Sequence, residues 1–375
     1  MNLTADALDK SAIQQAPATT RFDALTGFRC LAASMVFIYH NRKYWRAKLH
    51  PEVLRLFNEF HIGVSLFFVL SGFLIAYTYA DKPIHSVKKY SGYILIRLAR
   101  IMPLYWLILT CYYFDPAFGN RQFSLQTYSL FHAFSDVHNL DGIAQAWSLN
   151  VEIVFYFFAP FLCLLQRKHL LLLIGFLVLL FCITWTGGEL WHHINGNHER
   201  YFYPLKFVVE NTFPGRCTEF LAGILMASAI KSKKANWLSF IPYKTWIGFA
   251  GIFITAYCIG FFQPDIFHHG TDTIPGGLIH MFILPIFVVI ALTGLIQERT
   301  WLQKFFGSKL MIILGNASFA FYLVHISYIN LKLQQYVHLP DRNFILLWII
   351  SILLYYIFEK NIYVICRKWL RPLTT

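Results

Sequence analysis

Residues 21–41, RFDALTGFRCLAASMVFIYHN, are the stretch that decides the fold of this chain. As a helix the stretch is apolar enough to enter a bilayer, yet it contains Arg29 and reaches His40 near its end. Ionisable groups at membrane depth cost several kcal/mol unless they face protein or a wet cavity, so both residues are functional-site candidates. Eleven residues are about three helical turns, which places the two side chains on one face, about 16 Å apart. The alternative is that Arg29 reaches a lipid headgroup and His40 is an interfacial residue.

The composition is that of a polytopic helical membrane protein. The 375 residues are 57% hydrophobic and 14% charged, against about 45–50% and 25% in soluble domains. The formal net charge is +13, which raises the question of a nucleic-acid partner. A protein that binds a polyanion such as nucleic acid needs a contiguous basic patch, whereas these lysines and arginines fall in short groups between apolar runs. No nucleic acid is expected.

About ten apolar runs are long enough to cross a bilayer, which takes about 20 residues. Their centres lie near residues 33, 71, 105, 156, 177, 222, 253, 286, 320 and 353. Lysine and arginine concentrate in the segments that are inside when the N-terminus is inside, so both termini are expected in the cytoplasm. We expect an all-α bundle in a cell membrane, the inner one in a bacterium, with a polar tail at 1–20, one transmembrane domain at 21–370 and a C-terminal tail at 371–375.

Two arginines stand at the cytoplasmic entrance of the third span. Arg97 and Arg100, in IRLARIMPLYW, are three residues apart and therefore share a helix face. Two guanidinium groups side by side suit a phosphate or pyrophosphate. Ordinary anchoring by cytoplasmic cations explains the spacing equally well.

The fourth span begins with AWSLNVEIVFYFFAP and runs from outside inward. Trp147 and Glu152 are then expected in its outer half, at about the depth of His40. A carboxylate at this depth needs a partner, and an imidazole at matching depth supplies one. The prediction is a His40–Glu152 pair, in which the acid fixes the tautomer of the ring and stabilises its protonated form.

Further polar residues mark the other spans. Arg216 and Glu219, three residues apart, are either substrate contacts or an intrahelical ion pair. Asn316 is expected in the inner half of the ninth span and His325 in its outer half, where His325 either lines the site or is interfacial. Ser71, in FFVLSGFLIAY, lacks the pattern of a nucleophile elbow, so it is a residue for helix packing or substrate contact.

Together these residues resemble the acyltransferase 3 family of integral membrane acyltransferases. The resemblance covers residues 21–160 and 315–326. It rests on Arg29 and His40 with ten residues between them, the FFVLSGFL run, Arg97 and Arg100 before IMPLYW, the WSLNVE block and LGNASFAFYLVH. The WSLNVE block retains one of the two acids common in the family. Many relatives carry a fused extracytoplasmic SGNH domain, and this sequence shows none, so a second activity is expected from an extracytoplasmic partner enzyme.

The resemblance implies an acyl-CoA-dependent O-acyltransferase. It would move an acyl group, most often acetyl, from cytoplasmic acyl-CoA to a hydroxyl of a cell-envelope carbohydrate or glycolipid. Arg97 and Arg100, with Arg29, would hold the phosphates of the donor, and the pantetheine arm would extend toward His40.

The implied chemistry centres on His40. It would act as general base with support from Glu152, while Trp147 would shape the acceptor or acyl pocket. A transient acyl-His40 is the other open route. Neither route uses a metal, and the adjacent pairs His192–His193 and His268–His269 have no third ligand at a usual spacing, so no metal is expected.

Two other classes compete with an enzyme. A membrane transporter of a small or lipid-linked solute also places ionisable residues inside a bundle, but it predicts an internal repeat or matching broken spans, which the sequence lacks. A non-enzymatic scaffold would use the basic loop at 42–55, which carries five lysines and arginines after the first span.

Overall fold

Helices form every regular element of the chain that the structure describes. The computed structural model describes residues 22–45, 48–79, 84, 86–113, 124–196, 200–232, 237–265, 268–337 and 339–374. Within these ranges the one extended feature is an isolated bridge between Ser135 and Tyr201. The predicted all-α class is confirmed, and the predicted N-terminal tail at 1–20 lies outside the described residues.

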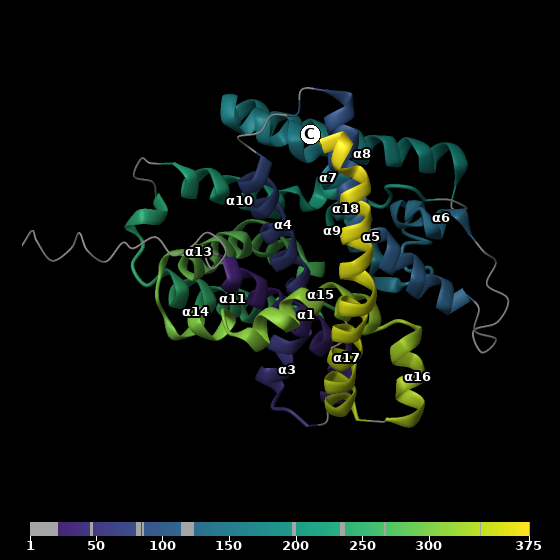
Figure 1. Ribbon diagram of the computed structural model, residues 1–375, viewed down its shortest axis with the longest axis vertical. Helices are drawn as coiled ribbons and strands as arrows, with labels where there is room; N and C mark the ends of the chain where they lie inside the picture. Colours follow the sequence, from purple (N-terminus) through teal and green to yellow (C-terminus); the bar gives the residue numbers. More distant parts are fainter. Residues whose placement is uncertain are drawn as a thin grey trace, which may run out of the picture.

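The helices follow one another along the chain as labelled in Figure 1. Those of the first half are α1 (Asp23–His40), α2 (Arg42–Trp45), α3 (Pro51–Asn58), η3 (Phe60–Ile62), α4 (Gly63–Tyr79), α5 (Val87–Tyr113), α6 (Leu125–Tyr128), η5 (Phe131–Phe134), η6 (Ala144–Ala146) and α7 (Trp147–Lys168). Those of the second half are α8 (Leu170–Asn195), α9 (Leu205–Asn211), α10 (Phe213–Lys231), η7 (Trp237–Phe240), α11 (Lys244–Gly260), η8 (Gly270–Asp272), α12 (Ile274–Leu278), η9 (Ile279–Ile283), α13 (Leu284–Gln297), α14 (Trp301–Phe306), α15 (Lys309–Val324), α16 (Tyr328–Tyr336), α17 (Pro340–Leu354), η10 (Tyr355–Glu359) and α18 (Lys360–Thr374).

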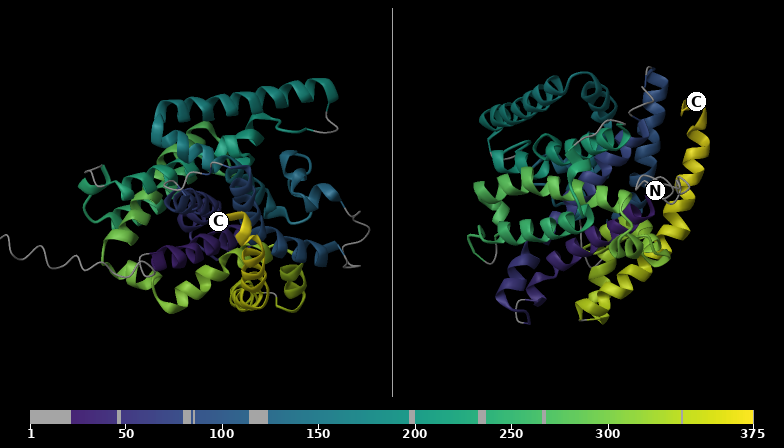
Figure 2. Two further views of the ribbon diagram at one scale, coloured as in Figure 1. Left: turned by 45° about the horizontal axis from the view of Figure 1, so that its top comes forward. Right: turned by 90° about the vertical axis from the view of Figure 1, so that its left-hand side faces the viewer.

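The helix predicted at 21–41 is α1, and it lies in the interior of the bundle (Figures 1 and 2). It packs against α4, α14 and α15, and most of its apolar side chains are buried. The contact with α15 is close because a Cβ at Gly315 would lie 1.8 Å from the carbonyl oxygen of Thr26. Since most of α1 is enclosed by protein, Arg29 is half-buried within the bundle, while His40, the last residue of the helix, is exposed.

Two glycines bring α4 and α10 into backbone contact. A Cβ on Gly72 would lie 2.3 Å from the carbonyl oxygen of Phe220, and one on Gly223 would lie 2.1 Å from that of Val69. A side chain larger than hydrogen therefore does not fit at either position without a backbone shift. The prediction that FFVLSGFLIAY packs closely against another helix is confirmed, and α4 and α10 hold the polar residues described below in a fixed register.

The outer helices expose apolar surface. α8 runs across one end of the molecule (Figure 2, left) and leaves leucine and isoleucine side chains exposed along its length. α5 and α18 lie side by side, and the predicted C-terminal tail at 371–375 is helical as far as Thr374. Apolar side chains on the outside of a helical bundle are typical of surfaces that face lipid.

The centres of all ten predicted spans fall within helices, but fewer than ten of these helices are long and apolar enough to cross a membrane. By length and composition, six helices of the described chain can cross a membrane, or seven if the pair Lys309–Val324 and Tyr328–Tyr336, bent by 86°, is one span. The remaining three, α1, α10 and α11, are shorter or more polar. A multi-pass membrane protein is supported, while ten crossings and cytoplasmic termini stay predictions.

Candidate active site

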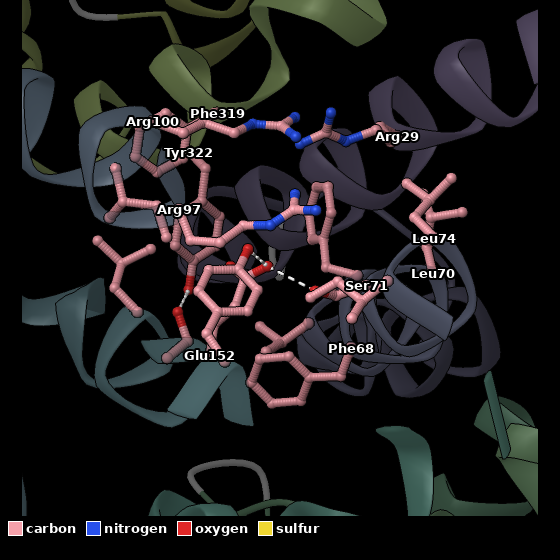
Figure 3. A pocket seen from close by; sticks show the side chains of 17 residues that line it. Arg29, Phe68, Leu70, Ser71, Leu74, Arg97, Arg100, Glu152, Phe319 and Tyr322 are labelled. Carbon is pink, nitrogen blue, oxygen red and sulfur yellow. Dashed lines mark hydrogen bonds between the residues drawn. The ribbon is translucent and has the colours of Figure 1, made fainter. Parts of the chain in front are cut away.

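Side chains of five helices enclose a cavity of about 80 Å³, which we call the arginine cavity. Figure 3 shows Arg29 from α1, with Arg97 and Arg100 from α5, on one side of it. The structure therefore brings together the three residues predicted to bind the donor. The rest of the lining, from α4, α5, α7 and α15, is Val64, Phe67, Phe68, Leu70, Ser71, Leu74, Ile75, Ile101, Ser148, Leu149, Glu152, Tyr156, Phe319 and Tyr322.

The guanidinium group of Arg97 is held by aromatic rings. Its central carbon lies 5.3 Å from the ring centroid of Tyr79, 5.7 Å from that of Tyr93 and 5.8 Å from that of Tyr156. Its Nε is buried and has no hydrogen-bond partner. Ring faces attract a cation without using its N–H donors. Arg97 is thus fixed in place while an N–H group remains open to an anion.

Glu152 belongs to the arginine cavity, and the predicted His40–Glu152 pair is not formed. The Oε1 atom of Glu152 accepts hydrogen bonds from the Ser71 hydroxyl at 2.8 Å and the Tyr156 hydroxyl at 2.6 Å. The prediction failed because Glu152 is five residues beyond Trp147 on α7, about 7.5 Å farther along the axis. Trp147 lines the same cavity as His40, described below, and Glu152 lines the same cavity as Arg29.

A second carboxylate approaches the same arginines from a π-helical turn. Glu359, the last residue of η10, is 9% exposed and interacts electrostatically with Arg100 and Arg29. π-helical turns are rare and are often found at functional sites. The cavity and its edge thus hold three guanidinium groups against two carboxylates, which leaves an excess of positive charge.

A larger cavity of about 430 Å³, the histidine cavity, adjoins the first. Val64 and Tyr322 line both cavities, so the two share a wall. Arg29 and His40, predicted to share one face of α1, line one cavity each. The other side chains of the histidine cavity are Val36, Tyr39, His61, Leu140, Ala144, Gln145, Trp147, Val209, Glu210, Asn211, Arg216, His269, Thr271, Gly277, His280, Met281 and Ile326, with Val64 and Tyr322.

The fully buried carboxylate of Glu59 anchors one side of the histidine cavity. Its Oε2 lies 3.1 Å from Nε2 of His61, and its Oε1 accepts from the Gln263 side chain at 2.6 Å and from the Gly270 N–H at 2.7 Å. Gly270 can come this close because a Cβ there would lie 1.8 Å from the carbonyl oxygen of Ile259. An acid that accepts three hydrogen bonds is stabilised as the carboxylate.

Loop residues complete this side of the cavity. Nε2 of His269 lies 2.9 Å from the Tyr39 hydroxyl, and burial lowers the pKa of His269 to about 4, so this ring is neutral at pH 7. Burial raises the pKa of Glu210, on the short helix α9, to about 7. The histidine cavity therefore has one carboxyl group that changes charge near neutral pH.

Arg216 and Glu219 form the predicted intrahelical ion pair, and Arg216 also reaches α4. Its Nε donates to both oxygens of Glu219 at 3.0 Å, and its NH2 donates to Ser65 Oγ at 3.0 Å. Since Ser65 accepts from the arginine, its own hydroxyl can donate to Nε2 of His280, 2.8 Å away. The guanidinium group lies 5.9 Å from the Trp147 ring centroid and lines the cavity, so Arg216 is both a structural partner and a cavity residue.

A family model described as an acyltransferase domain matches residues 22–358 of this sequence. The chain belongs to the acyltransferase 3 family. The matched region contains the arginine cavity through Tyr322 and the whole histidine cavity. The predicted membership is confirmed.

Curated relatives in the acyltransferase 3 family come from Staphylococcus aureus and are named for an inferred O-acetyltransferase activity. The proteins of strains COL and N315 are each 24% identical to this chain over 345 residues. The alignment covers 84% of this chain and 51% of each relative, so the chain spans about half their length. No solved structure matches the chain.

Three predicted substrate residues of this family member, Glu219, Asn316 and His325, lie outside the cavity linings. His325 is fully buried, and its ring packs against that of His40 with the centroids 5.2 Å apart. Its Nδ1 lies 2.7 Å from the Tyr322 carbonyl oxygen. Asn316 is half-buried on α15 and lines neither cavity.

Several ionisable residues in or beside the two cavities were missed from the sequence, among them the lining residues His61, Glu210 and His280 and the neighbouring Glu59 and Glu359. Glu59 and His61 fall in the turn between α3 and α4, and His280 and Glu359 fall in π-helical turns, where the 3.6-residue period breaks down. A charged residue beside the apolar run at 63–79 was a usable signal for Glu59, whereas nothing local points to His280.

Metal-ligand geometry is not found in the described parts of this family member. Within them, no group of three or more His, Cys, Asp or Glu side chains is arranged to hold a metal ion. His192 stacks on Tyr203 with ring centroids 3.9 Å apart, and His268 pairs with Asp265 at 2.8 Å. The adjacent histidine pairs thus have separate contacts.

Proposed function

We propose that this member of the acyltransferase 3 family transfers an acyl group from cytoplasmic acyl-CoA to a hydroxyl of a cell-envelope carbohydrate or glycolipid. Acetyl is the acyl group to test first, in keeping with the inferred activity of the Staphylococcus aureus relatives. The observation that carries the proposal is the pair of adjoining cavities, one with three guanidinium groups and the other with His40.

The arginine cavity suits the donor. Phosphate groups of coenzyme A bind to Arg29, Arg97 and Arg100, since planar guanidinium groups pair with phosphate oxygens through two N–H groups at once. Glu152, which accepts hydrogen bonds from Ser71 and Tyr156, faces the uncharged arm of the donor. The distance from Arg29 to His40 along α1, about 16 Å, is comparable with the length of a pantetheine arm.

The histidine cavity suits the acceptor and the chemistry. Trp147 offers an aromatic face to a sugar ring, with Arg216 above it as a hydrogen-bond donor. His40 is the reactive imidazole, either as general base on the acceptor hydroxyl or as a transient carrier of the acyl group. An acceptor in the cell envelope requires that this cavity lie on the outer side of the membrane. An extracytoplasmic partner enzyme is proposed as a further participant.

The test uses the purified protein in lipid nanodiscs with radiolabelled acetyl-CoA. Coenzyme A release and label transfer to a panel of envelope glycans are measured for the wild type and His40→Ala. Loss of both activities in His40→Ala, with acetyl-CoA binding retained, supports the proposal. Turnover that is unaffected by His40→Ala contradicts it.

A further inference from the structure

The histidine cavity contains a second imidazole that is better prepared to accept a proton than His40. His61 lines this cavity and lies against the buried carboxylate of Glu59, 3.1 Å from Nε2 to Oε2. Because Glu59 already accepts from Gln263 and Gly270, its oxygen acts as an acceptor toward His61 as well. Nε2 of His61 therefore carries the hydrogen, and Nδ1 has the free lone pair.

His40 lacks such a partner. Its ring neighbours are Tyr39, at 4.7 Å between centroids, and His325, at 5.2 Å, and among the described residues no carboxylate makes a hydrogen bond to it. The cation Arg42 interacts electrostatically with His40, and its guanidinium group lies over the Tyr39 ring. A ring that becomes an imidazolium needs an anion beside it, and one that attacks as a neutral nucleophile does not.

The two imidazoles are close enough to act on one substrate. The Tyr39 ring contacts both, with centroids 4.7 Å from His40 and 5.5 Å from His61. Both side chains line the same cavity of about 430 Å³. A hydroxyl that reaches an acyl group on His40 thus has His61 within the same enclosure.

We propose that His40 carries the acyl group and that His61, held by Glu59, deprotonates the acceptor hydroxyl. This inference rests on the acyl transfer proposed above and chooses between its two routes. In the first step the unprotonated ring nitrogen of neutral His40 bonds to the thioester carbonyl carbon and the C–S bond breaks. The proton on the other ring nitrogen of His40 goes to the sulfur. In the second step the acceptor oxygen bonds to that carbonyl carbon, the C–N bond breaks, and the hydroxyl proton passes to His61 and then to His40.

The two steps can be measured separately. Exchange of radiolabelled coenzyme A into unlabelled acetyl-CoA, without any sugar, reports formation of acyl-His40. Release of labelled acetate to water, and label transfer to glucose or N-acetylglucosamine, report the hydroxyl step, with water as the acceptor that is always present. Glu59→Gln and His61→Asn preserve approximate side-chain volume, so each isolates the proton-accepting function.

The matched control is the exposed pair His138–Asp141, whose Nδ1–Oδ2 distance of 3.0 Å resembles that of His61–Glu59 outside both cavities. We expect Glu59→Gln and His61→Asn to keep exchange within about threefold of wild type and to lower the hydroxyl step by about 100-fold or more, the usual range for a general base. Retained exchange also shows that the variants fold. His138→Asn is expected to change neither step.

Three outcomes overturn the inference. They are an unchanged hydroxyl step in both variants, equal loss of exchange and hydroxyl transfer, and absence of exchange in a wild type that transfers label. In the last case direct displacement with His40 as base stands, and the proposed acyltransferase function survives. Label transfer by His40→Ala would contradict both this inference and the role of His40 in the proposed function.

Discussion

The arginine cavity and the histidine cavity differ in how their residues are supplied. The arginine cavity is built from side chains inside long helices, at separations of one to four residues within each helix. The histidine cavity joins a helix end at His40, a short turn at His61, a loop at His269 and a π-helical turn at His280. Fixed helical spacing suits the recognition of a constant donor, while turns and loops can adapt a cavity to a particular acceptor.

The largest expected effect falls on the histidine cavity. His40→Ala removes the reactive imidazole and is expected to lower acyl transfer by about 100- to 10,000-fold, while the Kd for acetyl-CoA changes by less than about threefold. Transfer assays and equilibrium binding in nanodiscs give the two numbers. A large loss of acetyl-CoA affinity would show that donor binding is not confined to the arginine cavity.

The next effect falls on the arginine cavity. Arg100→Ala is expected to raise the KM for acetyl-CoA by about 10- to 100-fold with little change in kcat, since a charge-assisted hydrogen bond contributes about 1.5–3 kcal/mol. Lys88→Ala, which removes an exposed cation near the start of the same helix, is the control. Equal changes in KM for both variants would mean that only the general positive charge of α5 matters.

A smaller effect is expected from the carboxylate of the arginine cavity. Glu152→Gln is expected to weaken acetyl-CoA binding by about three- to tenfold, because Glu152 holds the Ser71 and Tyr156 hydroxyls in the arginine cavity. The pH dependence of kcat should stay as in the wild type. A shift of the acidic limb of that profile would instead indicate that Glu152 interacts with His40, as the sequence predicted.

The smallest effect concerns stability. The pKa of Glu210 is raised to about 7 by burial, so the native state binds this proton more tightly than the unfolded chain does. Stability is therefore lost as pH rises from about 5 toward 7, and Glu210→Gln should escape this loss. Thermal unfolding at pH 5 and pH 8 should show a larger decrease for wild type than for Glu210→Gln. The exposed carboxyl variant Asp341→Asn should behave as wild type.

The sequence predicted the parts of the site that depend on helical period. The spacing of Arg29 and His40 on α1, and that of Arg97 and Arg100 on α5, placed these residues correctly in or beside a cavity. On α7, Trp147 lines the cavity of His40 whereas Glu152 lines that of Arg29, because a five-residue step changes both the height and the cavity that a side chain faces. Glu59 escaped prediction since its partner Gly270 is 211 residues away, a contact that no local pattern contains.

The wall shared by Val64 and Tyr322 also bears on membrane energetics. Tyr322 is held by hydrogen bonds of its hydroxyl to Ser148 Oγ at 2.7 Å and to the Gln145 carbonyl oxygen at 3.2 Å. A continuous wet path through a bilayer would dissipate ion and proton gradients, and the side chains of Val64 and Tyr322 stand between the two cavities. In the proposed function the acyl group passes this wall on the donor arm, which itself fills the connection, so that the transfer needs no continuous water path.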